Sequence, residues 1–248
     1  MLAGLLVFLC VTGGAVGFAS NEDVEAQQAE PPGPVWTRAA EAPEGLLTPR
    51  EVELHDRFIE RAQAGDIDIV FFGTPDTEMW RSGARGRSVW DRAFGSVAAA
   101  NFGSQGTRVE SLLRRMQHGE LDGYQAKLVV LQTLDPGDRL EYVAGNTAIV
   151  AEIRARQPQA RILLFAPLPR GQTRELWRER AETDAGALAG LVDDEIVFHV
   201  DIGDRFYHPD GSFRSEMWSL DPATRGRQTP AFEVWAEELQ PWIDHFVN

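Results

Sequence analysis

Residues 67–80 read IDIVFFGTPDTEMW, and this stretch decides the fold of the chain. Its first half, Ile67–Phe72, is an apolar run interrupted only by Asp68 and rich in β-branched and aromatic residues. Such a run predicts a strand buried on both faces. Gly73 ends the run, and the polar turn that follows can start a helix. Ligands of open parallel sheets bind outside the carboxyl ends of the strands, so we expect the functional site at this turn.

The composition is that of an ordinary globular protein with one domain. The chain has 248 residues, 43% hydrophobic and 25% charged, which is enough for a full core. Its formal net charge of −14 argues against a nucleic-acid partner and against charge-driven binding to anionic membranes. The single cysteine, Cys10, precedes the body of the chain, which excludes disulfides and a cysteine nucleophile there. The histidines lack metal-ligand spacing, so we expect no metal and no other cofactor, and His55 and His199 are expected to pack in the body.

Two segments precede the predicted domain. Residues 1–19 have the length and apolarity of a signal peptide or a short membrane anchor, although no basic residue precedes the apolar stretch. Both interpretations stay open, and both predict an extracytoplasmic (secreted or periplasmic) or membrane-anchored protein that meets a membrane only through residues 2–19. Residues 20–47 are acidic and rich in proline, which predicts a flexible linker. The domain is expected at residues 48–248, where Thr48 and Glu51 form a capping box for a first helix.

Strand-like and helix-like segments alternate along the rest of the chain. Short β-branched runs recur after the opening strand, and helical patterns separate them, for example at Gly145–Gln157. This alternation predicts an α/β fold in three α/β/α layers, with a parallel sheet of about five strands. The four further strands are expected at Val97–Asn101, Lys127–Leu131, Arg161–Leu168 and Glu195–Asp201.

Five segments carry motifs: GTPDTEMW at 73–80, NFGSQGT at 101–107, HGEL at 118–121, PLPRG at 167–171 and FEVWAEELQP at 232–241. These segments resemble the sequence blocks of the SGNH (GDSL) hydrolases, most closely the platelet-activating-factor acetylhydrolase-like branch. The first block of that family reads GDSITEGW. The resemblance implies a flavodoxin-like strand order. It also implies an esterase site with a nucleophilic serine, a histidine base, and a glycine and an asparagine that donate to the oxyanion.

The catalytic positions of that family fall on residues that lack the required groups. The serine falls on Pro75, the asparagine on Pro136, and the histidine on Gly226, or on Ala223 when it is counted from the preceding block. Proline has neither a hydroxyl nor a backbone N–H, so it can neither attack a carbonyl nor donate to an oxyanion.

Two residues are predicted remnants of the family site. Gly106 aligns with the glycine whose N–H helps to hold the oxyanion, and Asp221 stands for the triad aspartate. With the other groups gone, we expect a non-catalytic domain, a pseudoenzyme, that binds a small ligand or a protein partner at the former active-site mouth. Its binding residues are predicted to be Gly73, Thr74, Asp76, Gly106, Thr107 and Trp218.

An enzymatic alternative stays open. Thr74, Asp76 or Glu78 could serve an esterase, an acetylhydrolase or a carbohydrate deacetylase of altered mechanism, since their hydroxyl and carboxylate groups share one turn. The plainer interpretation is that the two carboxylates stabilise the N-terminus of the following helix. One feature separates the two hypotheses, namely whether a base lies within hydrogen-bond distance of a hydroxyl at this mouth.

Overall fold

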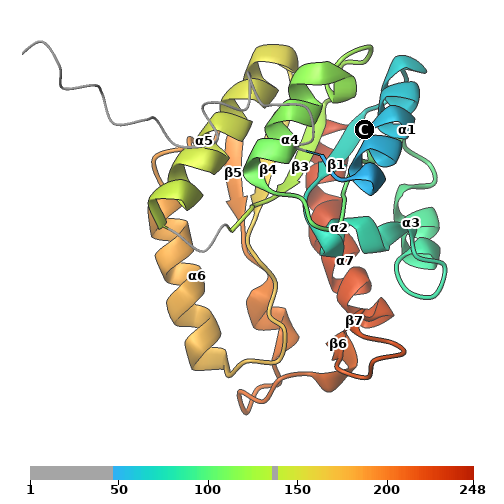
Figure 1. Cartoon of the computed structure of the whole chain (residues 1–248). Coiled ribbons are helices and arrows are strands. Elements are labelled where there is room, and N and C mark those ends of the chain that lie inside the picture. Colours follow the sequence, from blue (N-terminus) through green and yellow to red (C-terminus); the bar gives the residue numbers. More distant parts are fainter. Residues whose placement is uncertain (1–46, 136–138) are drawn as a thin grey trace, which may run out of the picture. The chain divides into compact units, whose positions relative to one another are not determined.

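The computed structural model describes residues 47–135 and 139–248. The predictions for residues 1–46 and for Pro136 lie outside this part of the chain. In it, a parallel sheet has the strand order β2-β1-β3-β4-β5, which confirms the predicted flavodoxin-like α/β/α fold (Figure 1). The strands are β1 (Ile69–Phe72), β2 (Ala99–Asn101), β3 (Leu128–Gln132), β4 (Arg161–Phe165) and β5 (Val197–Val200).

The apolar run at residues 69–72 forms β1, which is buried along its whole length. The strand pairs with β2 on one side and with β3 on the other, so that Val70 lies opposite both Ala100 and Val129. Because helices cover both faces of the sheet, neither face of β1 meets water, and the strand needs no polar side chain.

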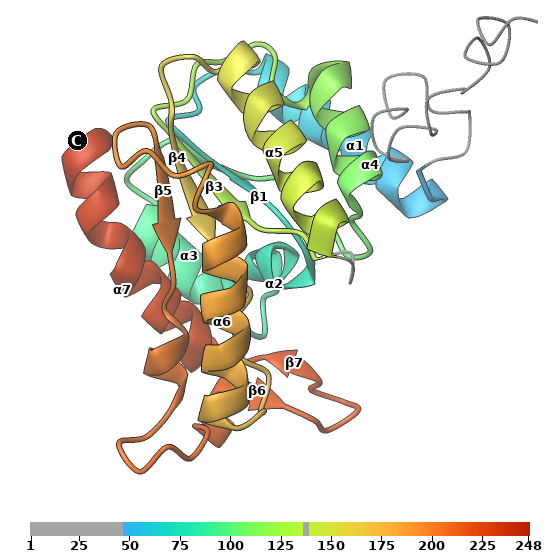
Figure 2. The same cartoon turned by 90° about the vertical axis from the view of Figure 1, so that its left-hand side faces the viewer.

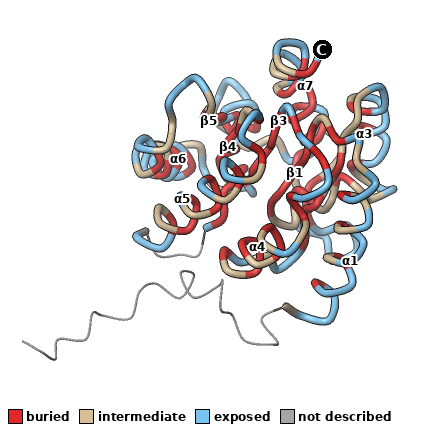
Figure 3. The backbone as a smooth tube through the Cα atoms, turned by 90° about the horizontal axis from the view of Figure 1, so that it is seen from above, coloured by how far each residue is buried: buried red, intermediate tan, exposed pale blue. Residues whose placement is uncertain are grey.

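Helices lie on both sides of the sheet (Figure 2). Their bounds are α1 (Pro49–Gln63), α2 (Pro75–Glu78), α3 (Arg87–Phe94), α4 (Val109–Arg115), α5 (Arg139–Arg156), α6 (Arg174–Leu188) and α7 (Thr229–Phe246). Helices α1, α4 and α5 cover one face, and α3 and α7 cover the other, while α6 continues past the carboxyl ends of the strands (Figures 1 and 2). Each face has its own apolar core, and the buried inner surfaces are seen in Figure 3. None of the helices in the described part of the chain has the length and apolarity of a membrane span.

Several predicted boundaries differ from the structure by one to six residues; for example, β1 begins at Ile69 rather than Ile67, and β5 spans Val197–Val200 rather than Glu195–Asp201. Strand β2 begins at Ala99 rather than Val97, because the chain turns there and the Ala99 N–H donates to the Val97 carbonyl (2.9 Å). Strand β4 ends at Phe165 rather than Leu168, because Pro167 cannot donate to a sheet ladder. Helix α5 starts at residue 139 rather than Gly145, because Leu140 in its first turn is 82% accessible and so lies off the apolar face that marks the rest of the helix.

Candidate functional site

A cavity of about 630 Å³ opens at the carboxyl ends of β1, β3 and β4. This volume lies within the range of roughly 300–1,000 Å³ that is typical of small-molecule sites. The ends of β1 and β3 give it a polar wall, and the start of α6 gives it an apolar wall. The lining residues are Thr74, Pro75, Gln132, Thr133, Asp135, Pro167, Leu168, Arg170, Gln172, Leu176, Trp177, Arg180, Ala181 and Asp184.

The turn after β1 places Thr74 and Pro75 at the cavity, as the N-cap and the first residue of α2. The Thr74 hydroxyl donates to the side-chain oxygen of Gln132 at 2.6 Å, and the Thr77 hydroxyl donates to the same oxygen at 3.0 Å. Gln132, the last residue of β3, is only 3% exposed. The two threonines therefore fix the orientation of a buried carboxamide at the edge of the cavity.

Asp76, the second residue of α2, forms a buried ion pair with Arg227. Its carboxylate is 1% exposed and accepts from Arg227 at 3.1 Å and, at a longer 3.4 Å, from Arg170. The Arg227 side chain is 0% exposed and also donates to the carbonyls of Leu168 (2.9 Å) and Pro169 (2.5 Å). Burial lowers the pKa of Arg227, and the charge of Asp76 opposes this shift. Asp76 therefore acts as the counter-ion of two guanidinium groups.

A short hairpin, β6 (Trp218–Ser219) and β7 (Gly226–Arg227), brings Arg227 to this place. The Trp218 ring packs against the guanidinium of Arg227 at 4.9 Å and against that of Arg170 at 5.4 Å. In this structure the predicted ligand contact Trp218 thus stacks on the two arginines and is not part of the cavity lining.

Gly226 occupies the position where the family resemblance places the histidine. Its φ of +117° lies in the left-handed region, which residues with a side chain rarely adopt. A Cβ atom there would also approach Met79 Cε to 2.8 Å and the Arg85 guanidinium to 3.2 Å. A larger residue at 226 would therefore be strained by this backbone conformation and would require the ends of the Met79 and Arg85 side chains to move.

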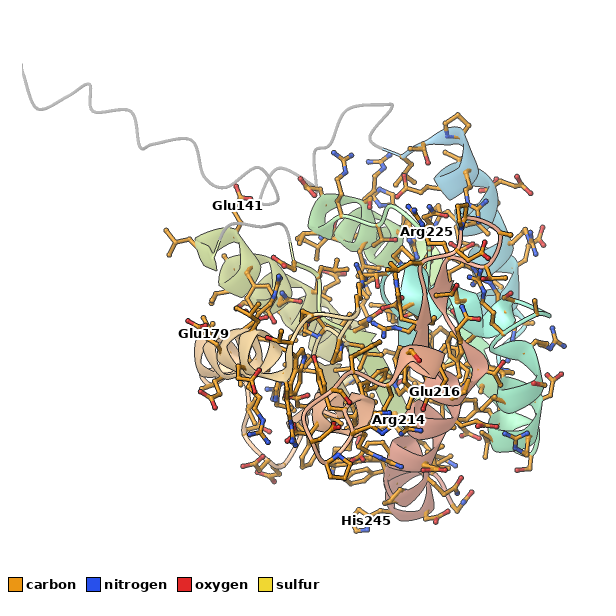
Figure 4. All side chains as sticks on the ribbon, turned by 90° about the horizontal axis from the view of Figure 1, so that it is seen from below. Glu141, Glu179, Arg214, Glu216, Arg225 and His245 are labelled. Atoms are coloured by element: carbon orange, nitrogen blue, oxygen red, sulfur yellow. The ribbon has the colours of Figure 1, made fainter. Side chains whose placement is uncertain are left out.

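Asp221 lies in the loop between β6 and β7, where it is exposed. Its carboxylate accepts the backbone N–H of Ala223 at 2.8 Å, which closes a local turn. Arg225 lies on the same exposed loop, and Arg214 and Glu216 lie on the segment that leads to the hairpin (Figure 4). The predicted remnant Asp221 is thus held by its own loop and is not a lining residue of the cavity.

Gly106 and Thr107 lie on an exposed loop beside Glu78. Gly106 has a φ of +80° with open space around it, and the Thr107 hydroxyl donates to the Ser104 carbonyl at 2.8 Å. Glu78 and Gln105 line a smaller cavity of about 260 Å³ that Pro75 also borders. Neither of these two predicted residues lines the main cavity, and Gly73 is buried.

Arginines engage the carboxylates around the mouth. Glu78 pairs with Arg50 and, at 3.7 Å, with Arg81, and it also accepts the Gln105 N–H at 2.5 Å. Arg180 pairs with Asp135 and lies 3.6 Å from Asp184 at the far end of the main cavity. Within residues 47–135 and 139–248, no group of three or more histidine, cysteine and carboxylate side chains is arranged to hold a metal ion.

Three residues of the site are not marked by the sequence alone, namely Gln132, Arg170 and Arg227. Gln132 follows a buried strand, so the rule that ligands bind at carboxyl strand ends could have found it. Arg170 belongs to the PLPRG motif but has no assigned role there. Arg227 is 151 residues from its partner Asp76, and no local pattern signals that pair.

Sequence comparison relates the chain to known proteins. Platelet-activating factor acetylhydrolase IB subunit alpha1 of Homo sapiens is 32% identical over 189 residues, covering 73% of this chain and 79% of that protein. The alpha2 subunit of Rattus norvegicus is 30% identical over 167 residues, covering 66% of this chain and 71% of that protein. No family model matches the chain.

Structure comparison agrees at the level of the fold. A solved structure from Streptococcus pneumonia has a TM-score of 0.62 at 16% identity and covers 78% of this chain and 92% of that one. A GDSL-like lipase from Bacteroides thetaiotaomicron has a TM-score of 0.55 at 12% identity, with coverages of 77% and 97%. By sequence and by fold, the chain belongs to the SGNH (GDSL) hydrolase family, together with the platelet-activating factor acetylhydrolase IB subunits.

Proposed function

We propose that this chain is a non-catalytic member of its family, a pseudoenzyme that binds a small ligand in the cavity beside Pro75. One observation carries the proposal: Asp76, the residue after Pro75, forms a buried ion pair with Arg227. Pro75, where the family nucleophile falls, offers no hydroxyl. Arg227 follows directly after Gly226, and a guanidinium has no lone pair with which to act as a base.

The nearest hydroxyl also lacks a base. Thr74 donates its proton to the carboxamide oxygen of Gln132, which is not a general base at neutral pH. Asp76 and Glu78, the carboxylates of the same turn, are both ion-paired with arginines. This arrangement favours binding over an esterase or deacetylase that would use Thr74, Asp76 or Glu78.

The cavity favours a small ligand over a purely protein partner. It is open, has a volume of about 630 Å³, and combines hydrogen-bonding groups with an apolar wall that includes Leu176 and Trp177. We place the binding domain outside the cytoplasm, either secreted or anchored, because residues 1–19 have the apolar composition of a signal peptide or anchor.

The test is hydrolysis of p-nitrophenyl acetate and p-nitrophenyl hexanoate by the purified full chain. Two variants accompany it: Thr74→Ala at the mouth, and Thr147→Ala on the exposed side of α5 as the matched control. We expect the native chain and both variants to release p-nitrophenol at the same rate as a heat-denatured sample.

Protein-dependent turnover that Thr74→Ala abolishes and Thr147→Ala leaves intact would overturn the proposal. That result would establish the altered esterase with Thr74 as its reactive residue. Turnover that neither variant changes would also overturn it, and Asp76→Asn and Glu78→Gln would then locate the responsible carboxylate.

A further inference from the structure

Gln132 presents an unused donor to the main cavity. Its side-chain oxygen accepts from Thr74 and Thr77, so the amide nitrogen is turned away from both hydroxyls. In the described part of the chain, those two bonds are the hydrogen bonds of this side chain, and its NH₂ group donates to no other residue. This nitrogen is not enclosed by protein atoms, so a ligand oxygen in the cavity can accept its hydrogen bond. The oriented amide therefore points to a ligand oxygen.

Arg170 brings an incompletely neutralised positive charge to the same cavity. The single carboxylate of Asp76 lies 3.1 Å from Arg227 but 3.4 Å from Arg170, which is near the limit of a hydrogen bond. The Arg170 side chain is 55% exposed, so most of its five N–H donors remain available. The turn at Asp76 thus has two guanidinium groups for one buried carboxylate, whereas the lining carboxylates Asp135 and Asp184 lie at the far end of the cavity with Arg180.

The opposite wall is suited to an apolar group. Leu176 is 61% exposed at the cavity, and Trp177, Ala181 and Leu168 also line it. An alkyl or aryl group that covers this wall would remove Leu176 from water, which is favourable in proportion to the apolar area buried.

Building on the function proposed above, we infer that the cavity binds an amphipathic monocarboxylate. Its carboxylate lies between the Arg170 guanidinium and the Gln132 amide, and its apolar chain lies on the wall formed by Leu168, Leu176, Trp177 and Ala181. The planar guanidinium matches the two oxygens of a carboxylate. One guanidinium that already faces Asp76 matches the single charge of a carboxylate better than the charge of about −1.5 to −2 of a phosphate monoester.

Calorimetric titration of the full chain tests this assignment with three probes that share one alkyl chain: hexanoate, hexanol and hexyl phosphate. We expect hexanoate to bind saturably, and the uncharged hexanol and the more highly charged hexyl phosphate to bind about tenfold more weakly or worse. Thermal unfolding of each variant below shows whether it is folded.

Two substitutions act on the two sides of the carboxylate site. Arg170→Met keeps the apolar stem but removes the charge, and it leaves Asp76 paired with Arg227. Gln132→Glu keeps an acceptor for both threonines but replaces the donor with a negative charge. Each is expected to weaken hexanoate about tenfold or more, with little effect on hexanol. The matched control is Arg178→Met, which changes the net charge equally at a side chain 50% exposed on α6, outside the cavity lining.

The outcomes are distinct. No saturable binding of hexanoate, or equal binding of hexanoate and hexanol, would overturn the inference, as would tighter binding of hexyl phosphate. An equal loss in Arg170→Met and Arg178→Met would also overturn it, because it would show a general charge effect. Hydrolysis of p-nitrophenyl hexanoate, measured on the same sample, reports separately on the proposed function. If the chain hydrolyses this ester, the proposed function is refuted. If it does not hydrolyse the ester and also shows no preference for hexanoate, only the inference about the carboxylate is refuted.

Discussion

Two ion clusters in the described part of the chain each hold a fully buried carboxylate, and they are built differently. The α1 cluster consists of His55, Arg115 and Glu120, and the mouth cluster consists of Asp76, Arg170 and Arg227. In the α1 cluster, the Arg115 guanidinium donates to both carboxylate oxygens of Glu120, at 2.8 and 3.0 Å. A ring nitrogen of His55 lies 2.8 Å from the same carboxylate. Arg115 and Glu120 are 1% and 0% exposed.

The clusters differ in the state of their arginines. In the α1 cluster, the guanidinium of Arg115 also bonds the Phe102 carbonyl and the Thr107 hydroxyl, so its donors are used inside the protein. In the mouth cluster, Arg227 is enclosed but Arg170 is half exposed and loosely bound. In the α1 cluster every charged group has a partner inside the protein, so the cluster stabilises the packing of the elements that carry it. In the mouth cluster Arg170 is partly exposed and weakly paired, so it can also bind a ligand.

The largest effect should come from the α1 cluster. Arg115→Met removes the bidentate partner and leaves the fully buried carboxylate of Glu120 with His55 alone. We expect the free energy of unfolding to fall by about 3–5 kcal/mol, the usual consequence of breaking a buried pair. Urea denaturation measures it. A fall of less than about 1 kcal/mol, as for a surface pair, would remove the distinction between the two clusters.

The variant Arg227→Met tests whether Arg170 can replace Arg227 as the partner of Asp76. Asp76 would then still have Arg170, which can move closer, so we expect a smaller fall of about 2–3 kcal/mol in the free energy of unfolding. The double variant Arg170→Met with Arg227→Met should lose more than the sum of the two single variants, because only then is Asp76 left without a partner. Additive losses in this double-mutant cycle would contradict the idea that Arg170 substitutes for Arg227.

Arg170→Met should change stability least among the three arginines. Its pairing with Asp76 is long and half exposed, so we expect a change below about 1 kcal/mol, as for a surface ion pair. The same urea experiment on Arg178→Met, a similarly exposed arginine, provides the scale. A substantially larger loss at 170 would assign Arg170 to the structure of the mouth rather than to a ligand.

Asp193, an exposed carboxylate outside both clusters, should have the smallest effect on stability. The N–H groups of Val197 and Ile196, with that of Glu195, lower the pKa of Asp193 to about 2. A carboxylate whose folded pKa is depressed adds stability above its unfolded pKa of about 3.9, and this stability is lost as the pH falls through the folded value. The difference in Tm between the native chain and Asp193→Asn should therefore be present at pH 7 and shrink between about pH 4 and pH 2. A difference that does not change over this range would show that the charge plays no part.

The fold is largely readable from the sequence because local signals agree with it. The run Ile67–Phe72 forms a buried strand, and the capping box of Thr48 and Glu51 starts α1, with its two bonds at 3.2 and 2.9 Å. The less accurate boundaries, such as the start of α5, lie where exposed residues remove the periodic pattern.

The site is less predictable because its contacts join distant parts of the chain. Thr74 is found at the cavity, since the turn after a buried strand is a local feature. Arg227 and Trp218 depend on a hairpin more than 130 residues further along the chain, and sequence spacing does not show how that hairpin folds back onto Asp76. The predicted contacts Gly106 and Thr107 remain predictions, and neither residue lines the main cavity.

The backbone at Gly226 has a consequence for laboratory evolution of this chain. A histidine at the aligned position 226 would have to adopt a left-handed backbone, and its Cβ would displace the ends of the Met79 and Arg85 side chains. A selection for ester hydrolysis should therefore recover no histidine at 226. A histidine that serves as a base should instead arise at a position around the mouth whose backbone has an ordinary negative φ.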